Sequence, residues 1–369
     1  MPKAAKIKKP LIVGMGGVGS LLATLLQELG MQVTALDRVK SPHVPKGIRF
    51  VSGDIGDGVW FARQLAEHDA VISCLPFHLT LAIAKAARKA GIAYFDPTED
   101  VKTTTAVRKL AQRAHKPMIP QCGLAPGIIG IIGSHLAKKF DKGTLRSLKL
   151  RVGALPQHPT GQLGYACNWS PEGLLHEYIA ECDVIAEGKR QRIPALKNEE
   201  VLHINGMEYE AFTTSGGLGT MTETFKGKIE TLDYKSIRYP GHLACMRLIL
   251  EELRFRENPD ELVKHIRYAL PPDDEDRVLI HVSAQGKSEG RWQTKVLVAQ
   301  YDPIVIAGKL RPAILWTTAV SIAAVIEMVN AGTLPARGFV RQEDIPLPAF
   351  LKTENGKLFA KNCPKLGTL

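Results

Sequence analysis

The sequence lacks the features of a membrane-spanning, disulfide-bonded or metal-binding protein. No apolar run reaches the ~18 residues that a membrane span requires. The most apolar segment, residues 313–329, contains Ser321 and Glu327, and we expect it to form a buried helix. The six cysteines form no CxxC pair and no cluster with histidine at zinc spacing. We therefore expect free thiols in a reducing compartment and no metal.

The charges are not gathered into a nucleic-acid-binding surface. The net charge is +11, but lysine and arginine are dispersed, and no basic helix or aromatic-interleaved basic patch occurs. The excess is explained by solvated side chains, or by a field that attracts an anionic cofactor and a carboxylate substrate. No signal-peptide apolar stretch precedes the first expected strand. We expect a cytoplasmic protein that binds neither nucleic acid nor membrane.

A glycine-rich turn between an apolar strand and a helical pattern is the most informative motif present. Residues 11–13 lead into Gly14-x-Gly16-x-x-Gly19, and leucines at helical spacing follow. In a dinucleotide-binding turn the first glycine permits the sharp bend, the second leaves room for a pyrophosphate, and the third lets the helix approach the strand. Asp37 ends the next strand near the expected spacing of about 20 residues, where a carboxylate bonds ribose hydroxyls.

The motif predicts a nicotinamide dinucleotide as cofactor. Asp37 favours NAD, because its carboxylate would repel the 2′-phosphate of NADP. Arg38 follows directly and is suited to bind that phosphate, so NADP is the alternative. In open α/β sheets ligands bind beyond the carboxyl ends of the strands. From the turns at these strand ends we expect further cofactor contacts by Gly17, Val18, Asp54, Ile55, Ser73, Cys74, Leu75, Pro76, Gly123 and Leu124.

The 369 residues predict two domains of different class. Strands and helices alternate over residues 1–126, which predicts an α/β Rossmann domain with a doubly wound parallel sheet, completed by a helix at about 310–332. Strands dominate residues 127–309, which predicts an α+β substrate-binding domain on an open mixed sheet. The proline-containing residues 333–369 are expected to form an irregular tail on the surface.

Acidic and imidazole side chains near strand ends are candidates for catalysis. Asp96 and Glu99 follow the strand at 92–95, where a carboxylate can hold a cationic amine or manage a proton. The alternative for Asp96 is an Asp-Pro turn before the next helix. His242 is another candidate for proton transfer, with a structural role as the alternative.

Several residues are candidates for substrate binding. Arg238 suits a bidentate bond to a carboxylate, or else forms a surface ion pair. A hydroxyl- and glycine-rich loop at 213–220 can clamp a carboxylate with backbone N–H groups. Ser170 is expected to cap a helix that starts at Pro171. The full set of predicted substrate contacts is Phe77, Asn168, Trp169, Thr214, Ser215, Gly216 and Arg238.

Four motifs together resemble the saccharopine dehydrogenase family. They are GLAPG at 123–127, WSPEGLL at 169–175, TSGG at 214–217 and IRYPGH at 237–242. In length, and in EAFTTSGG at 210–217 with YKSIRY at 234–239, the chain looks most similar to the lysine 6-dehydrogenase branch.

The resemblance implies a Rossmann domain, a second domain whose sheet supports a homodimer, and NAD(P)-dependent oxidation of a C–N bond. In the lysine branch the ε-amine of L-lysine becomes an imine, which water converts to aminoadipate semialdehyde and ammonia. The alternatives are a saccharopine dehydrogenase, which needs room and cations for a second amino acid, and a non-catalytic NAD-binding protein.

Overall fold

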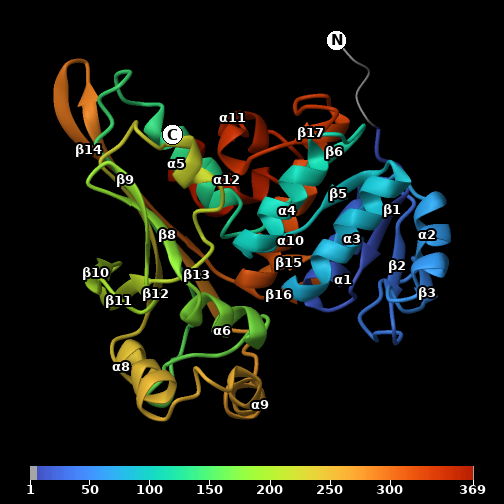
Figure 1. Cartoon of the computed structure of the whole chain (residues 1–369), viewed down its shortest axis with the longest axis horizontal. Coiled ribbons are helices and arrows are strands. Elements are labelled where there is room, and N and C mark those ends of the chain that lie inside the picture. The colour runs from blue at the N-terminus through green and yellow to red at the C-terminus, as the bar shows by residue number, and fades with distance from the viewer. Residues whose placement is uncertain (1–5, 369) are drawn as a thin grey trace. The chain divides into compact units, whose positions relative to one another are not determined.

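The computed structural model describes residues 6–368 and divides the chain into two compact units (Figure 1). The first unit runs to Ile131 and includes Leu315–Asn362. The second unit comprises Ile132–Ile314 and the residues from Cys363 onward.

A seven-stranded parallel sheet forms the first unit. Its strands, in spatial order, are β17 (Gly338–Phe339), β6 (Pro117–Ile119), β5 (Ala93–Phe95), β4 (Ala70–Ser73), β1 (Pro10–Val13), β2 (Thr34–Asp37) and β3 (Arg49–Ser52). The associated helices are α1 (Gly17–Glu28), α2 (Gly58–Ala66), α3 (Phe77–Ala90), α4 (Val101–Ala111) and α10 (Ala313–Asn330), and α5 (Ile128–Ala137) starts in this unit and continues into the second. The order reverses between β4 and β1, which is where doubly wound sheets bind ligands. The predicted Rossmann architecture is confirmed.

The central strands are apolar because both faces of a parallel sheet are covered. All four residues of β1 and of β4 are buried. Leu11, Val71 and Tyr94 from neighbouring strands pack in one cluster with Phe61 of α2. This core fixes the carboxyl ends of the strands, on which the candidate cofactor residues lie.

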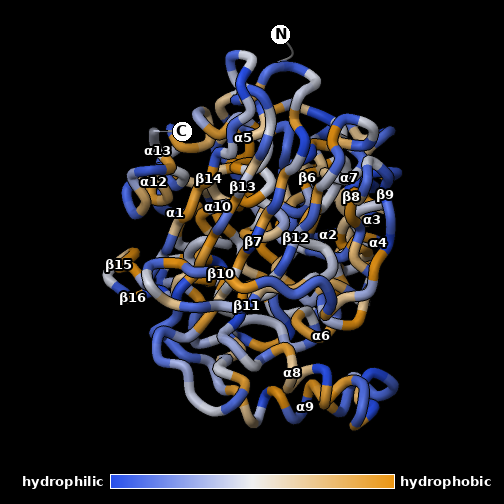
Figure 2. The backbone as a smooth tube through the Cα atoms, turned by 90° about the vertical axis from the view of Figure 1, so that its left-hand side faces the viewer, coloured by the Kyte–Doolittle hydropathy of each residue, from blue (hydrophilic) through white to orange (hydrophobic). Residues whose placement is uncertain are grey.

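Helix α10 returns late in the chain to the first unit. Asn330 accepts a hydrogen bond from the backbone N–H of Ile7 (2.7 Å) and donates one to its carbonyl (3.0 Å). By length and composition the helix could cross a membrane, and Figure 2 colours it by hydropathy. However, 78% of the helix is buried, as in a core helix of a globular protein. The sequence segment that we expected to complete the Rossmann unit lies within that unit from Leu315 onward.

The C-terminal tail differs from the irregular surface chain that we expected. Strand β17 extends the sheet by pairing with β6, and two short helices follow, α11 (Leu347–Phe350) and α12 (Lys357–Asn362). The rings of Phe350 and Phe359 are fully buried, with centroids 5.8 Å apart. The prolines misled the prediction because Pro346 and Pro348 lie at the start of α11 and Pro364 at the start of a further short helix, where proline is tolerated.

The second unit contains an eight-stranded mixed sheet, as predicted. Its main path is β10 (Glu200–Ile204), β11 (Met207–Thr213), β12 (Thr231–Arg238), β7 (Ser147–Pro156), β13 (Asp276–Ser288) and β14 (Arg291–Tyr301). The sheet also includes β8 (Cys182–Ala186) and β9 (Lys189–Ile193), while β15 (Ile304–Ile306) and β16 (Lys309–Arg311) form a separate hairpin. The sequence did not predict these four strands. In β9 the run KRQRI is almost wholly exposed and lacks apolar alternation.

Helices of the second unit cover a separate apolar core. They are α6 (Pro171–Ile179), α7 (Met221–Thr224), α8 (His242–Arg247), a π-helical turn (Leu248–Glu252), α9 (Pro259–Ala269) and the terminal α13 (Pro364–Gly367). Leu174 and Tyr178 of α6 and Ile266 of α9 pack in one cluster with Ile237 of β12. This packing places the carboxyl end of β12 beneath the helices.

Candidate functional site

The glycine turn after β1 has the geometry of a dinucleotide cradle. Gly14 has φ +98°, a conformation that favours glycine. A Cβ on Gly19 would lie 1.9 Å from the Gly14 carbonyl oxygen, so helix α1 approaches the strand as closely as glycine allows. A Cβ on Gly16 would meet no protein atom within 4 Å. The open space at Gly16 and the N-terminus of α1 therefore fit a pyrophosphate.

Asp37, at the end of β2, stabilises this turn. Its Oδ2 accepts a hydrogen bond from the Met15 N–H, and its Oδ1 accepts one from the Arg38 N–H, both at 2.7 Å. Each carboxylate oxygen retains acceptor capacity for a ribose hydroxyl. The side chain of Arg38 is exposed beside it. Both predicted determinants of cofactor preference thus lie at one strand end.

Some of the other residues predicted to contact the cofactor also stabilise the fold. The Ser73 hydroxyl is fully buried, 3.2 Å from that of Thr80, so its side chain is used within the unit and the predicted cofactor contact of Ser73 stays a prediction. Asp54 accepts a hydrogen bond from the Gly56 N–H and stabilises its own turn. Gly123 is required by packing, since a Cβ there would lie 2.9 Å from the Pro97 Cβ. The remaining predicted contacts stay predictions: Gly17 and Val18 begin helix α1, and Ile55, Cys74, Leu75, Pro76 and Leu124 lie in the loops that follow the strands.

Asp96 is a fully buried carboxylate at the end of β5. It accepts hydrogen bonds from the Tyr94 hydroxyl (2.5 Å) and from the N–H groups of Thr98 (2.8 Å) and Gln121 (3.3 Å). Burial raises the pKa of Asp96 to about 7, although the three hydrogen bonds act to lower it; the charge of half-buried Glu99 adds to the increase. From the sequence we expected Asp96 to hold a substrate amine. In the structure, hydrogen-bond donors of its own unit surround this carboxylate, so it does not present an open face to such an amine.

Phe77 and Cys74 lie at the junction of β4 and α3. Phe77 is the first residue of α3, half-buried, with its ring edge-on to His78 (5.8 Å). Burial, with a further contribution from Asp96, raises the pKa of Cys74 to about 12, so its thiol stays protonated at neutral pH. The predicted contact between Phe77 and substrate stays a prediction.

In the second unit, Arg238 is buried among aromatic rings instead of forming a surface ion pair. Only 4% of the residue is exposed. Its guanidinium lies over the rings of Tyr165 (4.8 Å) and Tyr178 (5.7 Å), and its Nε–H donates to the Tyr178 hydroxyl (2.8 Å). Burial lowers the pKa of Arg238, but Tyr178, Tyr165 and Glu177 outweigh that effect and raise it above its usual value. Arg238 therefore stays charged.

His242 is not a free proton-transfer group. It is 1% exposed, and both ring nitrogens are engaged: Nε2 with the Tyr178 hydroxyl (3.0 Å) and Nδ1 with the Leu163 carbonyl (2.8 Å). Burial, together with the charge of Arg238, lowers the pKa of His242 to about 3. The proposed catalytic role was wrong because the sequence does not reveal this burial.

The helix start at Ser170 is as predicted, but its neighbours differ. The Ser170 Oγ accepts a hydrogen bond from the Gly173 N–H (3.1 Å). Asn168 exchanges two hydrogen bonds with the backbone of Asp273, both at 2.7 Å, and so fastens a loop instead of presenting its amide to a ligand. Trp169 donates from Nε1 to the Tyr165 hydroxyl (2.9 Å), which places it beside the Arg238 cluster.

The hydroxyl groups of the loop after β11 are also used internally. Thr214 and Ser215 are buried; the former bonds the Ser236 hydroxyl (2.8 Å) and the latter donates to the Glu181 carbonyl (2.8 Å). Gly216 has φ +92° and is partly exposed. The predicted clamp therefore has no free hydroxyl from these two residues, and only its backbone N–H groups are suited to a ligand.

Two family models together match nearly the whole chain. The NADP binding domain of saccharopine dehydrogenase matches residues 11–120, and the saccharopine dehydrogenase C-terminal domain matches residues 123–353. The chain belongs to the saccharopine dehydrogenase family. This membership confirms the resemblance to the family seen in the sequence, without distinguishing the lysine branch.

Individual relatives of the saccharopine dehydrogenase family are distant. The L-glutamate-forming, NADP(+)-dependent saccharopine dehydrogenases of Saccharomyces cerevisiae and Pyricularia oryzae are 27% and 24% identical, each over 46% of this chain. The matches span 40% and 39% of those relatives. The solved apo structure of the L-Glu-forming S. cerevisiae enzyme aligns with a TM-score of 0.73 at 16% identity, over 94% of this chain and 97% of that one. This structural similarity supports the fold described above, with its parallel-sheet unit and its mixed-sheet unit.

Within this member of the saccharopine dehydrogenase family, three lysine or arginine residues in the described range 6–368 are buried, all in the second unit. Arg151 is neutralised by Glu200 and by a two-point bond to Asp233 (2.9 and 3.0 Å). Lys235 pairs with Glu200 (3.0 Å). Arg238 forms no salt bridge in that range. A buried cation without a carboxylate partner is suited to receive one from a ligand.

The sequence analysis did not predict the tyrosines that form hydrogen bonds with the candidate site residues. Tyr94, Tyr165 and Tyr178 carry the hydrogen bonds to Asp96, Trp169 and Arg238. Tyr178 had one usable signal, because it lies on the apolar stripe of α6, four residues after Leu174.

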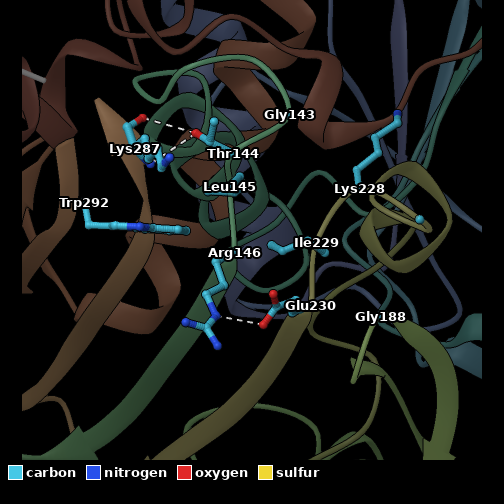
Figure 3. A pocket seen from close by; sticks show the side chains of 11 residues that line it. Gly143, Thr144, Leu145, Arg146, Gly188, Lys228, Ile229, Glu230, Lys287 and Trp292 are labelled. Carbon is cyan, nitrogen blue, oxygen red and sulfur yellow. Dashed lines mark hydrogen bonds and ion pairs between the residues drawn. The ribbon is translucent and has the colours of Figure 1, made fainter. Parts of the chain in front are cut away.

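A separate cavity of about 550 Å³ contains none of the predicted site residues (Figure 3). It lies at the ends of β7 and β13 and is lined in part by Arg146, Lys228, Lys287 and Trp292. Arg146 is already paired with Glu230 (2.7 Å). We therefore do not assign this cavity to the family's dinucleotide or amino-acid site.

The open space at Gly16 can be tested by Gly16→Ala. The added methyl group meets no protein atom, so stability should be unchanged, but it would occupy the space of the pyrophosphate. Losing one hydrogen bond to a charged group weakens binding roughly tenfold. We expect at least that loss in NAD(P) affinity, measured by fluorescence titration. Gly58→Ala, which also meets no neighbour, is the matched control. Unchanged affinity in Gly16→Ala would place the pyrophosphate elsewhere.

The raised pKa of Asp96 predicts a pH-dependent contribution to stability. The folded-state pKa (about 7) exceeds the usual 3.8, so the folded protein holds the proton more tightly. This stabilisation is complete below pH 3.8 and is lost as the pH rises through 7. In urea unfolding from pH 4.5 to 8, wild type should therefore lose stability relative to Asp96→Asn. Exposed Asp274→Asn serves as the control, and parallel pH profiles for wild type and Asp96→Asn would contradict the assignment.

Proposed function

We propose that this protein is an NAD(P)-dependent dehydrogenase that oxidises the ε-amine carbon of L-lysine. The amine becomes an imine with loss of a hydride and a proton, and water then yields aminoadipate semialdehyde and ammonia. The observation that carries the proposal is Arg238, a buried cation with aromatic walls and no carboxylate partner among residues 6–368. We assign it the α-carboxylate of the substrate.

The number of available buried cations favours lysine over a larger substrate. Arg151 and Lys235 are neutralised within the sheet, which leaves Arg238 as the single buried cation for an anion in the described chain. Lysine carries one carboxylate, whereas saccharopine carries three. A desolvated carboxylate needs a cation or several donors, so the second unit supports the smaller anion better.

The residues of the two units have separate tasks in this proposal. The cradle at Gly14, Gly16 and Gly19 would bind the pyrophosphate, and Asp37 the ribose. The nicotinamide ring, when bound, supplies the hydride acceptor. Arg238 binds and orients the substrate carboxylate. Asp96, hydrogen-bonded to Tyr94 and with its pKa near neutrality, is the group of the first unit suited to hold or release a proton.

A saccharopine dehydrogenase is the second candidate, because both curated relatives described above carry that activity in their names. It would need cations beyond Arg238 for the additional carboxylates of saccharopine. A protein that binds NAD without turnover is the third candidate.

The three candidates are separated by a substrate panel. Purified protein is mixed with NAD or NADP and with L-lysine, saccharopine or related diamines, and absorbance at the reduced-nicotinamide band is followed. Turnover with lysine and release of ammonia support the proposal. Turnover with saccharopine alone, releasing glutamate, would replace it with the second candidate. Cofactor binding without any turnover would favour the third.

Arg238→Ala should separate substrate binding from cofactor binding. Loss of the charge-assisted hydrogen bond to the carboxylate should raise the lysine KM roughly tenfold to a hundredfold, while the cofactor KM stays within about twofold. Arg238→Met preserves side-chain volume in case the alanine variant unfolds. Arg190→Ala, which removes a cation paired with Asp183 in the same unit, is the control. Equal effects on both KM values would contradict the assigned role.

A further inference from the structure

Arg238 lies at one end of a continuous chain of hydrogen bonds that joins three elements of the second unit. Its Nε–H donates to the Tyr178 hydroxyl oxygen in α6 (2.8 Å). Tyr178 lies 3.0 Å from Nε2 of His242, the first residue of α8. The other ring nitrogen, Nδ1, lies 2.8 Å from the Leu163 carbonyl oxygen. The positions of α6, β12 and α8 can be followed in Figure 1.

The chemistry of these groups determines which one donates and which one accepts in each hydrogen bond of the chain. A carbonyl oxygen only accepts, so the proton of His242 is on Nδ1. Burial lowers the pKa of His242 to about 3, so the ring is neutral near pH 7 and Nε2 accepts. Burial raises the pKa of Tyr178 to about 12, so its hydroxyl keeps the proton and donates it to Nε2. The Tyr178 oxygen is thereby left as an acceptor that faces Arg238.

Further contacts restrict the guanidinium and the imidazole. Nη1 of Arg238 donates to the Ile237 carbonyl (2.8 Å), and the rings of Tyr165 and Tyr178 lie against the guanidinium carbon. His242 stacks on Phe212, with ring centroids 6.2 Å apart and planes 11° apart. Within residues 6–368, Nη2 of Arg238 has no hydrogen-bond partner. Nε and Nη1 are thus anchored, and the Nη2 edge is left for a ligand.

We propose that Tyr178 and His242 are positioning residues for substrate binding: the chain from Leu163 through His242 and Tyr178 fixes the Arg238 guanidinium so that its Nη2 edge receives the substrate carboxylate. This inference rests on the proposed function, in which Arg238 binds a carboxylate. It assigns His242 a role that requires it to remain neutral, in contrast to a proton-transfer group. The orientation of Tyr178 depends on that neutral ring, because a protonated Nε2 would compete as a donor.

The test is Tyr178→Phe, which keeps the ring under the guanidinium and removes only the hydroxyl. The hydrogen bond lost from Arg238 has a charged donor, and loss of such a bond corresponds to roughly tenfold. We expect the lysine KM to rise by about that factor or more, with kcat and the cofactor KM nearly unchanged. Tyr239→Phe is the matched control, because it removes a buried hydroxyl of the same core that is bonded to the Pro156 carbonyl (2.8 Å) and not to the Arg238 guanidinium.

Variants of His242 test the direction of the chain. His242→Leu removes the acceptor for Tyr178, whereas His242→Gln provides an amide oxygen as an acceptor. The leucine variant should raise the lysine KM as Tyr178→Phe does, and the glutamine variant should restore part of the loss. If Tyr178→Phe and Tyr239→Phe change Tm, kcat and both KM values to the same extent, the role of Tyr178 is only structural and the proposal is overturned.

A readout that does not need turnover separates this inference from the proposed function. In NMR of ¹⁵N-labelled protein, the Arg238 Nε–H should exchange slowly in wild type and faster in Tyr178→Phe, and His242 should show the neutral Nδ1–H tautomer. Titration with L-norleucine, which has the carboxylate of lysine but no ε-amine, should show weaker binding to Tyr178→Phe than to Tyr239→Phe. These results without lysine turnover would reject the proposed reaction and keep the positioning role. Unchanged exchange and norleucine affinity, with lysine turnover intact, would reject the positioning role alone.

Discussion

The close approach of helix α1 to strand β1 is the constraint on which the first unit depends. A single methyl group at Gly19 would lie 1.9 Å from the Gly14 carbonyl oxygen, so the helix can start where it does only with glycine at that position. The same turn is secured by Asp37, which accepts the Met15 N–H from the neighbouring strand end. The close approach of Gly19 to Gly14 therefore sets where helix α1 begins relative to the sheet. The N–H groups of the first helical turn can bind an anion at the glycine turn only if the helix begins at this point.

In the second unit the main constraint is the burial of positively charged side chains. Moving a guanidinium out of water is costly unless other groups compensate. Arg151 is compensated within the sheet by Asp233 and Glu200, which is a structural solution. Arg238 is compensated by two aromatic faces, a tyrosine oxygen and a carbonyl, which leaves its charge unneutralised by any direct ion pair in the described chain. These contacts stabilise the buried guanidinium in the folded protein and leave its positive charge able to attract a carboxylate. This contrast between two buried arginines distinguishes a site from a structural ion pair.

Two predicted catalytic groups illustrate how burial changes the chemistry of a side chain. Asp96 and His242 occupy strand and helix ends that are accessible in many α/β enzymes, yet both are enclosed. Burial raises the pKa of the carboxyl to about 7 and lowers the pKa of the imidazole to about 3. Each shift favours the neutral form, as desolvation does. Consequently the Asp96 carboxyl changes its protonation state near neutrality, whereas His242 stays neutral there and serves as a fixed acceptor.

The sequence by itself determined the Rossmann unit, the mixed sheet of the second unit and the family, because glycine spacing, strand periodicity and contiguous motifs are local properties of the chain. It also determined the N-cap at Ser170, whereas the site roles of Arg238 and Asp96 stay predictions. Tertiary structure alone decided that Ser73, Asn168, Thr214 and Ser215 use their polar groups internally. It also decided that residues after 333 add a strand and buried aromatics to the first unit. The physical reason is that a side chain's burial and hydrogen-bond partners depend on residues far away in the chain: Tyr178 and Arg238 are 60 positions apart.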